Sequence, residues 1–103
     1  MIHAQARLRV VTALSVLGED DRVTFPWLKD LLSMSAGNLS VHLRKLDEAE
    51  YVEITKTFQG RTPVTFVRLT MRGRLAFEQY VTALQRLLDA GHTNTQRKAR
   101  DST

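Results

Sequence analysis

The stretch SMSAGNLSVHLRKLDEAEYV, residues 33–52, decides the fold of this chain. Leu39, Leu43 and Leu46 recur at helical spacing and predict a helix with one buried face. Ser35 stands where an N-cap is expected, because its side chain can accept a hydrogen bond from the first free N–H groups of a helix. Small, amide, hydroxyl and basic side chains occupy the other face. That face is either ordinary solvated surface or a surface that binds a partner.

The flanking sequence predicts short elements in a definite order. They are a helix at 2–17, an extended piece at 23–25, helices at 27–32 and 36–49, strands at 51–58 and 63–69, and a helix at 71–90. About three residues separate the second helix from the third, which is the spacing of a helix-turn-helix. The polar QGRT between the strands predicts a β-hairpin with an exposed tip, and Val52, Ile54 and Phe58 share one face of its first strand. This order predicts a winged helix, mainly α-helical with a small β-hairpin (α+β).

Length and composition fit one small domain. The 103 residues carry a net charge of +4, with 15 Lys and Arg against 11 Asp and Glu. A basic balance fits nucleic acid or an anionic membrane surface as the partner, and it fits equally a soluble protein that happens to be basic. The chain has no cysteine, which excludes disulfides and Cys-based zinc sites and fits a cytoplasmic protein. No stretch approaches the ~18 to 20 apolar residues of a membrane span, so no membrane partner is expected.

The two ends of the sequence have different characters. The apolar run in RLRVVTALSVLG follows basic residues, as in a weak signal peptide, but Thr12 and Ser15 interrupt it and a structural helix is favoured. After residue 90 the sequence HTNTQRKARDST is polar, and it is expected to be a disordered tail. The expected domains are therefore a winged helix domain at 1–90 and a tail at 91–103.

The exposed face of the third predicted helix carries side chains that suit a DNA major groove. Asn38 can pair with adenine, and Ser40 with a base or a phosphate. Val41 can contact a thymine methyl group, and Arg44 can bind guanine or a phosphate. His42, at the flank of this face, is expected to be a hydrogen-bond partner or a phosphate contact.

The predicted hairpin adds positive charge. Residues 55–77 include five basic residues and neither Asp nor Glu; the five are Lys56, Arg61, Arg68, Arg72 and Arg74. This composition is expected to place positive charge next to the hairpin tip, where phosphates can be bound. The alternative is an edge strand protected by Lys and Arg. The helix and the hairpin together favour DNA binding.

The segments AGNLSVHLRKLDEAEYV, KTFQGRTPVTFVRLT and GRLAFEQYVTAL resemble the winged helix-turn-helix transcription regulators related to the MarR and ArsR repressors. The resemblance covers about residues 5–88, and it implies a recognition helix at 35–49, a wing at 56–65 and a DNA-binding homodimer. The predicted DNA contacts are Ser35, Gly37, Asn38, Ser40, Val41, His42, Arg44 and Lys45 on the helix, and Lys56, Arg61 and Thr62 on the wing. Glu50 departs from the group, which usually has Gly there. A left-handed helix end at Glu50 would be mildly strained, or the corner has a different geometry.

The first and last predicted helices carry apolar stripes wider than one small domain can cover. In the last helix the apolar residues approximate an a/d spacing. The expected dimer interface is Leu8, Val11, Phe77, Tyr80, Val81, Leu84, Leu87 and Leu88. The alternative is that these side chains cover only the core of their own chain.

Other functions have less support in the sequence. The three histidines are scattered and have no metal-ligand spacing, so neither a metal site, a cofactor nor an enzyme is expected. A small-molecule effector pocket stays open, because Phe25, Trp27 and Tyr80 either line one or belong to the core. The rival function is a winged helix that binds another protein and not DNA. The favoured prediction is a homodimeric transcriptional regulator, a repressor in the absence of a visible activation surface, which binds a near-palindromic duplex site.

Overall fold

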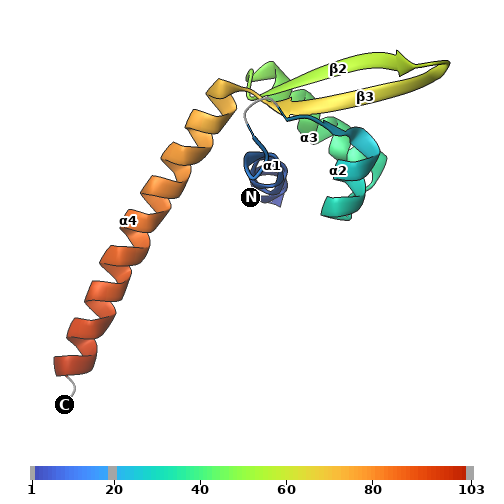
Figure 1. Ribbon diagram of the computed structural model, residues 1–103. Helices are drawn as coiled ribbons and strands as arrows, with labels where there is room; N and C mark the ends of the chain where they lie inside the picture. Colours follow the sequence, from blue (N-terminus) through green and yellow to red (C-terminus); the bar gives the residue numbers. More distant parts are fainter. Residues whose placement is uncertain (1, 19–20, 102–103) are drawn as a thin grey trace.

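The computed structural model describes the backbone of residues 2–18 and 21–101 and the side chains of residues 5–18 and 21–91. Figure 1 shows the arrangement of its helices and strands. They are α1 (Ile2–Ser15), β1 (Val23–Thr24), α2 (Phe25–Leu32), α3 (Ala36–Glu48), β2 (Val52–Gln59), β3 (Thr62–Leu69) and α4 (Met71–Asp101). The predicted fold class is confirmed, and apart from the end of α4 each element lies within a few residues of its expected bounds.

The helix-turn-helix of α2 and α3 is defined by its caps. Thr24 Oγ1 accepts a hydrogen bond of 3.3 Å from the N–H of Trp27 at the start of α2. Ser35 Oγ accepts one of 3.1 Å from the N–H of Asn38 at the start of α3, as its predicted role as N-cap requires. Between the helices Ser33 has a φ of 54°, the left-handed conformation that ends a helix. These caps produce the short turn that the sequence predicts.

The three strands form one antiparallel sheet in the order β1-β3-β2, so β3 is the central strand. Val67 of β3 lies opposite Val23 on one side and Ile54 on the other. The last pair of the β2–β3 hairpin is Gln59 with Thr62, which leaves a two-residue loop. Gly60 in this loop has a φ of 63°, a conformation that two-residue hairpin loops favour and glycine adopts without strain.

The core lies where α1, α2 and α3 meet one face of the sheet. Its most deeply buried side chains are Val10, Leu14, Leu28, Leu39, Val52 and Val67. Leu43 and Leu46 extend the buried row along α3, as predicted. Because these leucines fix one face of α3 against the core, the opposite face is left in solvent.

Helix α4 differs from the prediction at its C-terminal end. The sequence predicts a helix over 71–90 and a disordered tail from 91, but the structure continues α4 to Asp101. Gly91 is the weakest helix former in this part of α4, at a cost of about 1 kcal/mol, and the QRKAR at 96–100 consists of good helix formers. Figure 1 shows that α4 leaves the rest of the fold and projects outward. None of the helices in the described part of the chain is long and apolar enough to span a membrane.

Candidate nucleic-acid interface

Helix α3 presents a polar face opposite its buried leucines. The exposed residues on this face and at its N-cap are Ser35, Gly37, Asn38, Ser40, Val41, Arg44 and Lys45. Val41 is 45% exposed, and it is the kind of apolar side chain that can contact a thymine methyl group. The hydroxyl oxygen of Ser35 is used by the helix cap, so we expect Ser35 to act mainly by ordering the first turn. The α3 surface therefore combines small, amide, hydroxyl, apolar and basic groups.

His42 is the exception among the residues predicted to face outward from α3. Its side chain is only 7% exposed. It follows Leu39 by three residues and precedes Leu46 by four, and this helical spacing turns it toward the core. The prediction that His42 stands at the flank of the exposed face and contacts a phosphate is therefore wrong.

Three of the five basic residues in the acid-free segment are occupied by contacts within the chain. Arg68 pairs across the strands with Glu53 at 3.0 Å, and Arg72 pairs with Glu50 at 3.3 Å. Arg74 donates hydrogen bonds of 3.2 Å to two main-chain carbonyls at the end of α1, those of Ser15 and Leu17. The expectation that all five basic residues gather positive charge beside the hairpin tip is corrected, because these three side chains contact partners within the chain.

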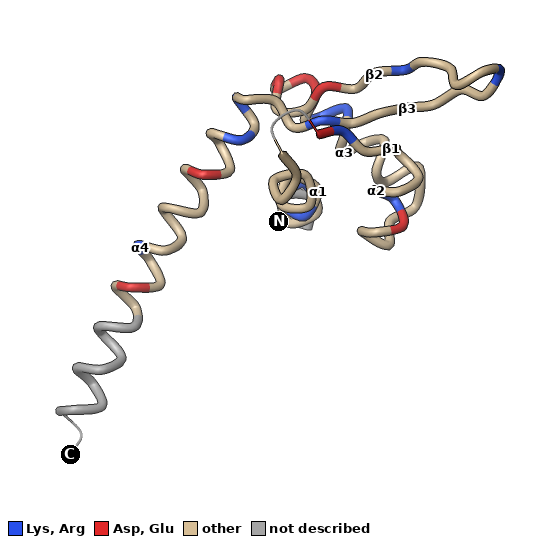
Figure 2. The backbone as a smooth tube through the Cα atoms, in the orientation of Figure 1, with Lys and Arg blue, Asp and Glu red and all other residues tan. Residues whose placement is uncertain are grey.

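The cations at the outer end of the hairpin are Lys56 and Arg61. Both side chains are exposed, and neither forms an ion pair within the described residues. Figure 2 shows basic positions on β2 and at the tip of the hairpin. Thr62 is also exposed next to the tip. Lys56, Arg61 and Thr62, the wing residues that the resemblance implies, are thus all exposed to solvent.

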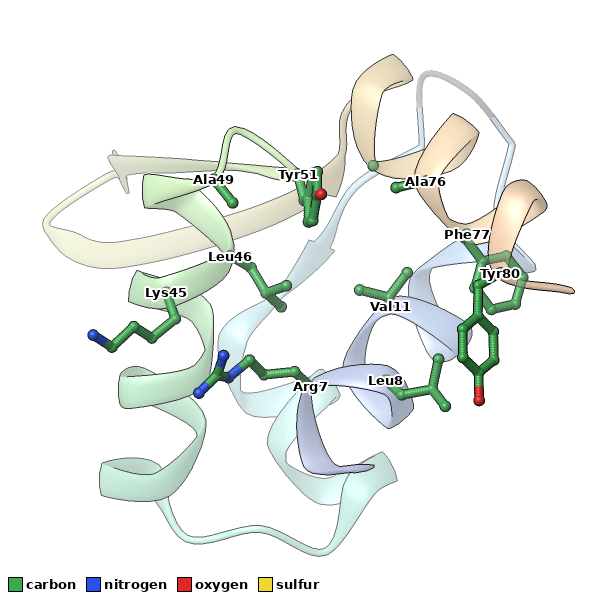
Figure 3. A pocket seen from close by; sticks show the side chains of 11 residues that line it. Arg7, Leu8, Val11, Lys45, Leu46, Ala49, Tyr51, Ala76, Phe77 and Tyr80 are labelled. Carbon is green, nitrogen blue, oxygen red and sulfur yellow. The ribbon is translucent and has the colours of Figure 1, made fainter. Parts of the chain in front are cut away.

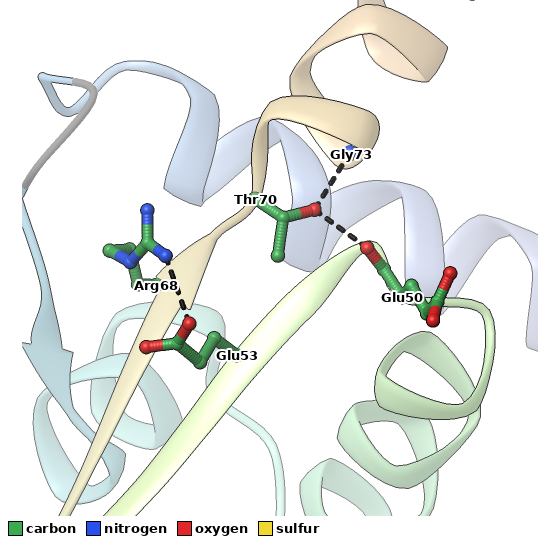
Figure 4. A network of polar contacts seen from close by, with 5 residues as sticks. All are labelled: Glu50, Glu53, Arg68, Thr70 and Gly73. Atoms are coloured by element: carbon green, nitrogen blue, oxygen red, sulfur yellow. Dashed lines mark hydrogen bonds and ion pairs between the residues drawn. The ribbon is translucent and has the colours of Figure 1, made fainter.

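The corner between α3 and β2 adopts the first of the two geometries left open for Glu50, the left-handed one. Glu50 has a φ of 64°. The N–H of Tyr51 reaches the carbonyl of Leu46 at 2.9 Å and that of Glu50 reaches Asp47 at 2.9 Å, which is the Schellman pattern of a helix end. Figure 4 shows that Thr70, just before α4, binds this corner through the Glu50 carbonyl. The start of α4 is therefore tied to the end of α3.

A mostly apolar cavity of about 330 Å³ lies between α1, the end of α3 and α4 (Figure 3). Tyr51, Phe77 and Tyr80 contribute its aromatic walls, while Arg7 and Lys45 lie together on one side. The Nε atom of Arg7 is buried and makes no hydrogen bond within the described residues. Of the three aromatic residues considered for a pocket, only Tyr80 lines this one. Trp27 is 46% exposed elsewhere and Phe25 packs against the core.

The residues expected at a dimer interface divide into two groups. Val11 belongs to the core of its own chain and Phe77 packs against that core. Both side chains therefore cover their own core, which was the alternative to a dimer interface. Leu8 and Val81 are partly buried. The outward group on α4 is Tyr80, Leu84, Leu87 and Leu88, whose exposed fractions are 46%, 41%, 71% and 62%. These four positions share one side of a projecting helix.

Sequence reasoning missed two features of this surface. Phe58 shares the face of β2 that carries Val52 and Ile54, as predicted, but it is 68% exposed. Its exposure could have been predicted from its position in the hairpin. Phe58 pairs with Pro63 close to the loop, where few core side chains lie within reach. Arg7 was not singled out, since nothing in its local sequence shows that α1 brings it beside Lys45. Within the described residues no group of three or more His, Cys, Asp or Glu is placed to hold a metal.

Comparisons with known proteins agree with this arrangement. Residues 6–88 match the family described as the winged helix DNA-binding domain. An uncharacterized protein of Methanocaldococcus jannaschii is 36% identical over 78 residues, which is 75% of this chain and 84% of that protein.

Two solved structures illustrate the shared fold. A transcriptional regulator homologue from Pyrococcus horikoshii has a TM-score of 0.75 at 24% identity, over 84% of this chain and 82% of that chain. MepR of S. aureus, solved in complex with DNA, has a TM-score of 0.70 at 14% identity, over 94% of this chain and 77% of its own. The resemblance drawn from the sequence motifs is confirmed, and this chain belongs to the winged helix DNA-binding domain family.

Proposed function

We propose that the protein is a transcriptional regulator that binds a specific duplex DNA site as a homodimer. In this proposal α3 enters the major groove, and the β2–β3 hairpin lies over the flanking backbone. The observation that carries this proposal is that the exposed face of α3 and the outer part of the hairpin lie on the same side of the molecule. The hairpin reaches past α3 on the side away from α1, so it overhangs the exposed face of α3 (Figures 1 and 3). A duplex on this side would meet the α3 side chains and the hairpin cations together.

The roles of individual residues follow from their chemistry. Asn38 and Arg44 carry the amide and guanidinium groups that read base edges, while Gly37 allows the helix end to approach closely. Lys56 and Arg61 supply sequence-independent attraction to phosphates. Lys45 and Ser40 suit backbone contacts beside the base-reading residues. The fold that MepR shares, and the DNA in its solved complex, support this assignment.

The homodimer is proposed from the exposed apolar side of α4. Leu87 is 71% exposed, so covering it with another apolar surface would make the free energy of association more favourable. A twofold dimer would place two α3 helices about 34 Å apart, one turn of duplex, and would require a near-palindromic site. A small domain that covers a promoter in this way would exclude the polymerase, so we propose repression.

Binding of a duplex selected by the protein from a random pool tests the proposal. The selection yields the site, its symmetry and its half-site spacing together. Affinity for that duplex is then measured by fluorescence anisotropy between about 50 and about 200 mM NaCl, where log K should fall linearly with log salt. No enrichment of any sequence and no salt-dependent duplex binding would reject the function.

Two variants separate base reading from backbone binding. We expect Arg44→Ala to cost roughly 1–3 kcal/mol on the selected site and to relax sequence preference there. Arg61→Ala should weaken all duplexes alike and reduce the salt slope by about one per bound chain. If both variants bind like the wild type, the residues assigned to the interface are wrong.

A protein-interaction module is the second candidate. Trp27 and Leu31, which are one helical turn apart on α2, are 46% and 54% exposed, and an exposed aromatic–aliphatic pair of this kind suits a protein partner. Salt distinguishes the two functions. A module that binds protein through an apolar surface would show weak salt dependence and no duplex binding.

A further inference from the structure

Phe58 occupies a position in the hairpin that the fold does not explain. Its ring is 68% exposed, although it is an aromatic side chain near the end of a strand. Phe66, on the opposite face of the hairpin, has a partner within the chain, because the guanidinium of Arg22 lies 3.9 Å from its ring centroid. Phe58 instead lies opposite Pro63, so the outer end of the hairpin carries an apolar pair in solvent.

The strand register decides which way this pair faces. Side chains along a strand alternate between the two faces of a sheet. Val52 is buried in the core, so the alternate positions Lys56 and Phe58 lie on the same, helix-side face. Opposite residues share a face, which adds Pro63 to it. The outer half of β2 is exposed from Lys56 onward, because there the hairpin extends past the core.

The outer part of the hairpin extends past α3. Its helix-side face and the exposed face of α3 lie on the same side of the molecule. Figures 1 and 3 show the hairpin extending beyond α3, away from α1. The apolar pair therefore lies on the face of the hairpin that is turned toward the side of α3. Lys56 shares its face, and Arg61 is at the tip two residues before Pro63. No Asp or Glu occurs from residue 54 to 77, so an anionic partner meets no acidic side chain on the outer part of the hairpin.

We propose that Phe58 and Pro63 form an apolar wedge that enters the DNA minor groove beside the major groove occupied by α3. This inference rests on the proposed function, and it adds a contact that is apolar and not ionic. Apolar side chains, Phe and Pro among them, enter minor grooves by partly unstacking a base step. Lys56 and Arg61 hold the phosphates on either side while the ring makes the contact.

The wedge has a consequence for sequence preference. Pyrimidine–purine steps unstack at lower cost than other steps. The wing therefore favours a TA or CA/TG step at the flank of each half-site, although no side chain reads that step by hydrogen bonds. A second copy of the chain is a poor occupant of this surface, because it would bring another Lys56 and Arg61 against the same cations.

The variant Phe58→Ala tests the wedge in the full chain. The probe is the duplex that the wild-type protein selects from a random pool. We expect Phe58→Ala to lower affinity about tenfold at every salt concentration, as removal of an aromatic ring from an interface does, with an unchanged salt slope. Arg61→Ala should instead reduce the slope by about one per bound chain. Thr57→Ala, on the other face of the same strand, is the matched control and should bind like the wild type.

A second readout reports the unstacking itself. With 2-aminopurine at the flanking step, wild-type binding should raise its fluorescence, whereas Phe58→Ala binding should not. Unchanged affinity and fluorescence for Phe58→Ala, or a changed salt slope, would overturn the wedge while leaving DNA binding intact. A loss of dimer mass in Phe58→Ala would overturn it in favour of a contact between copies. If the wild type binds no duplex at all, the proposed function itself fails, so the two failures are distinguishable.

Discussion

Thr70 ties the start of α4 to the end of α3, because its Oγ1 donates a hydrogen bond of 2.7 Å to the main-chain carbonyl of Glu50. The same oxygen accepts a bond of 3.0 Å from the N–H of Gly73, which makes Thr70 the cap of α4. Its own N–H donates to the carbonyl of Tyr51 at 3.0 Å. One residue thus fixes α4 to the corner between α3 and β2.

Replacing Thr70 by Val removes the hydroxyl and keeps the shape of the side chain. We expect the free energy of unfolding to fall by about 1–2 kcal/mol, because both the cap and the bond to Glu50 are lost. Urea denaturation followed by circular dichroism measures the change. Thr82→Val, at an exposed position of α4, is the control and should stay within about 0.5 kcal/mol of the wild type. Equal losses in the two variants would show that the Thr70 hydroxyl does not stabilise the corner.

Glu50→Gly should stabilise the protein. A residue with a Cβ in the left-handed conformation costs roughly 1–2 kcal/mol, and glycine avoids this at an entropic cost of about 0.5–1 kcal/mol. The exposed pair with Arg72 contributes little to offset the gain. We expect a net gain of about 0.5–1 kcal/mol, seen as a rise in Tm of about 2 to 6 °C. Glu48→Gly, inside the last turn of α3, should lower Tm instead, and a lowered Tm for Glu50→Gly would contradict the strain.

Gly73→Ala should be among the most destabilising single-methyl changes in the chain. A Cβ at this position would overlap the main-chain carbonyl oxygen of Tyr51 and lie 2.8 Å from Cδ1 of Leu69. Backbone cannot move aside as a flexible side chain can, so we expect a loss of about 3 kcal/mol. Gly37→Ala is the matched control, because a Cβ there meets no atom within 4 Å and alanine favours the helix. Chemical denaturation should give opposite signs for the two variants, and a mild effect at Gly73 would mean that α4 shifts readily.

The features that local sequence predicts are those that depend on spacing and caps. Leu39, Leu43 and Leu46 recur at a period that the helix itself imposes, and Ser35 precedes them where an N-cap belongs. The sequence leaves the conformation of Glu50 open, because this position lacks the glycine that usually marks a left-handed helix end. His42 was misplaced for a local reason. A helical wheel places His42 at the edge of the exposed face, whereas in the structure it is buried with Leu39 and Leu46.

Long-range contacts explain the rest of what sequence could not show. Arg74 reaches the carbonyl of Ser15, 59 residues away along the chain, and no local pattern reveals that bond. Val11 likewise appears as part of a wide apolar stripe, and only the packing of α1 against the core decides that it is buried. The hairpin cations and several leucines of α4 stay exposed, whereas other residues of the same chemistry make contacts within the chain.

His42→Ala separates a core role from a DNA contact. Because the side chain is buried, we expect a loss of about 1–3 kcal/mol of folding stability. The salt slope of duplex binding should stay unchanged, whereas loss of a phosphate contact would lower it by about 0.9. Stability is measured by urea denaturation and the slope by fluorescence anisotropy, at a temperature where the variant is folded. A reduced slope would restore His42 to the DNA interface.

Leu87→Glu tests the homodimer through the exposed side of α4. A charge in place of an apolar side chain that the partner covers costs the dimer its burial and leaves an unpaired carboxylate in the interface. Light scattering should give twice the chain mass of 11.7 kDa for the wild type and the single-chain mass for Leu87→Glu. Thr82→Glu places the same charge almost opposite on α4 and should remain a dimer. Duplex affinity should fall with dimerisation in Leu87→Glu, because each chain then holds only one half-site. A wild-type protein that is monomeric at micromolar concentration would refute the homodimer, and a Leu87→Glu variant that stays dimeric would move the interface away from this side of α4.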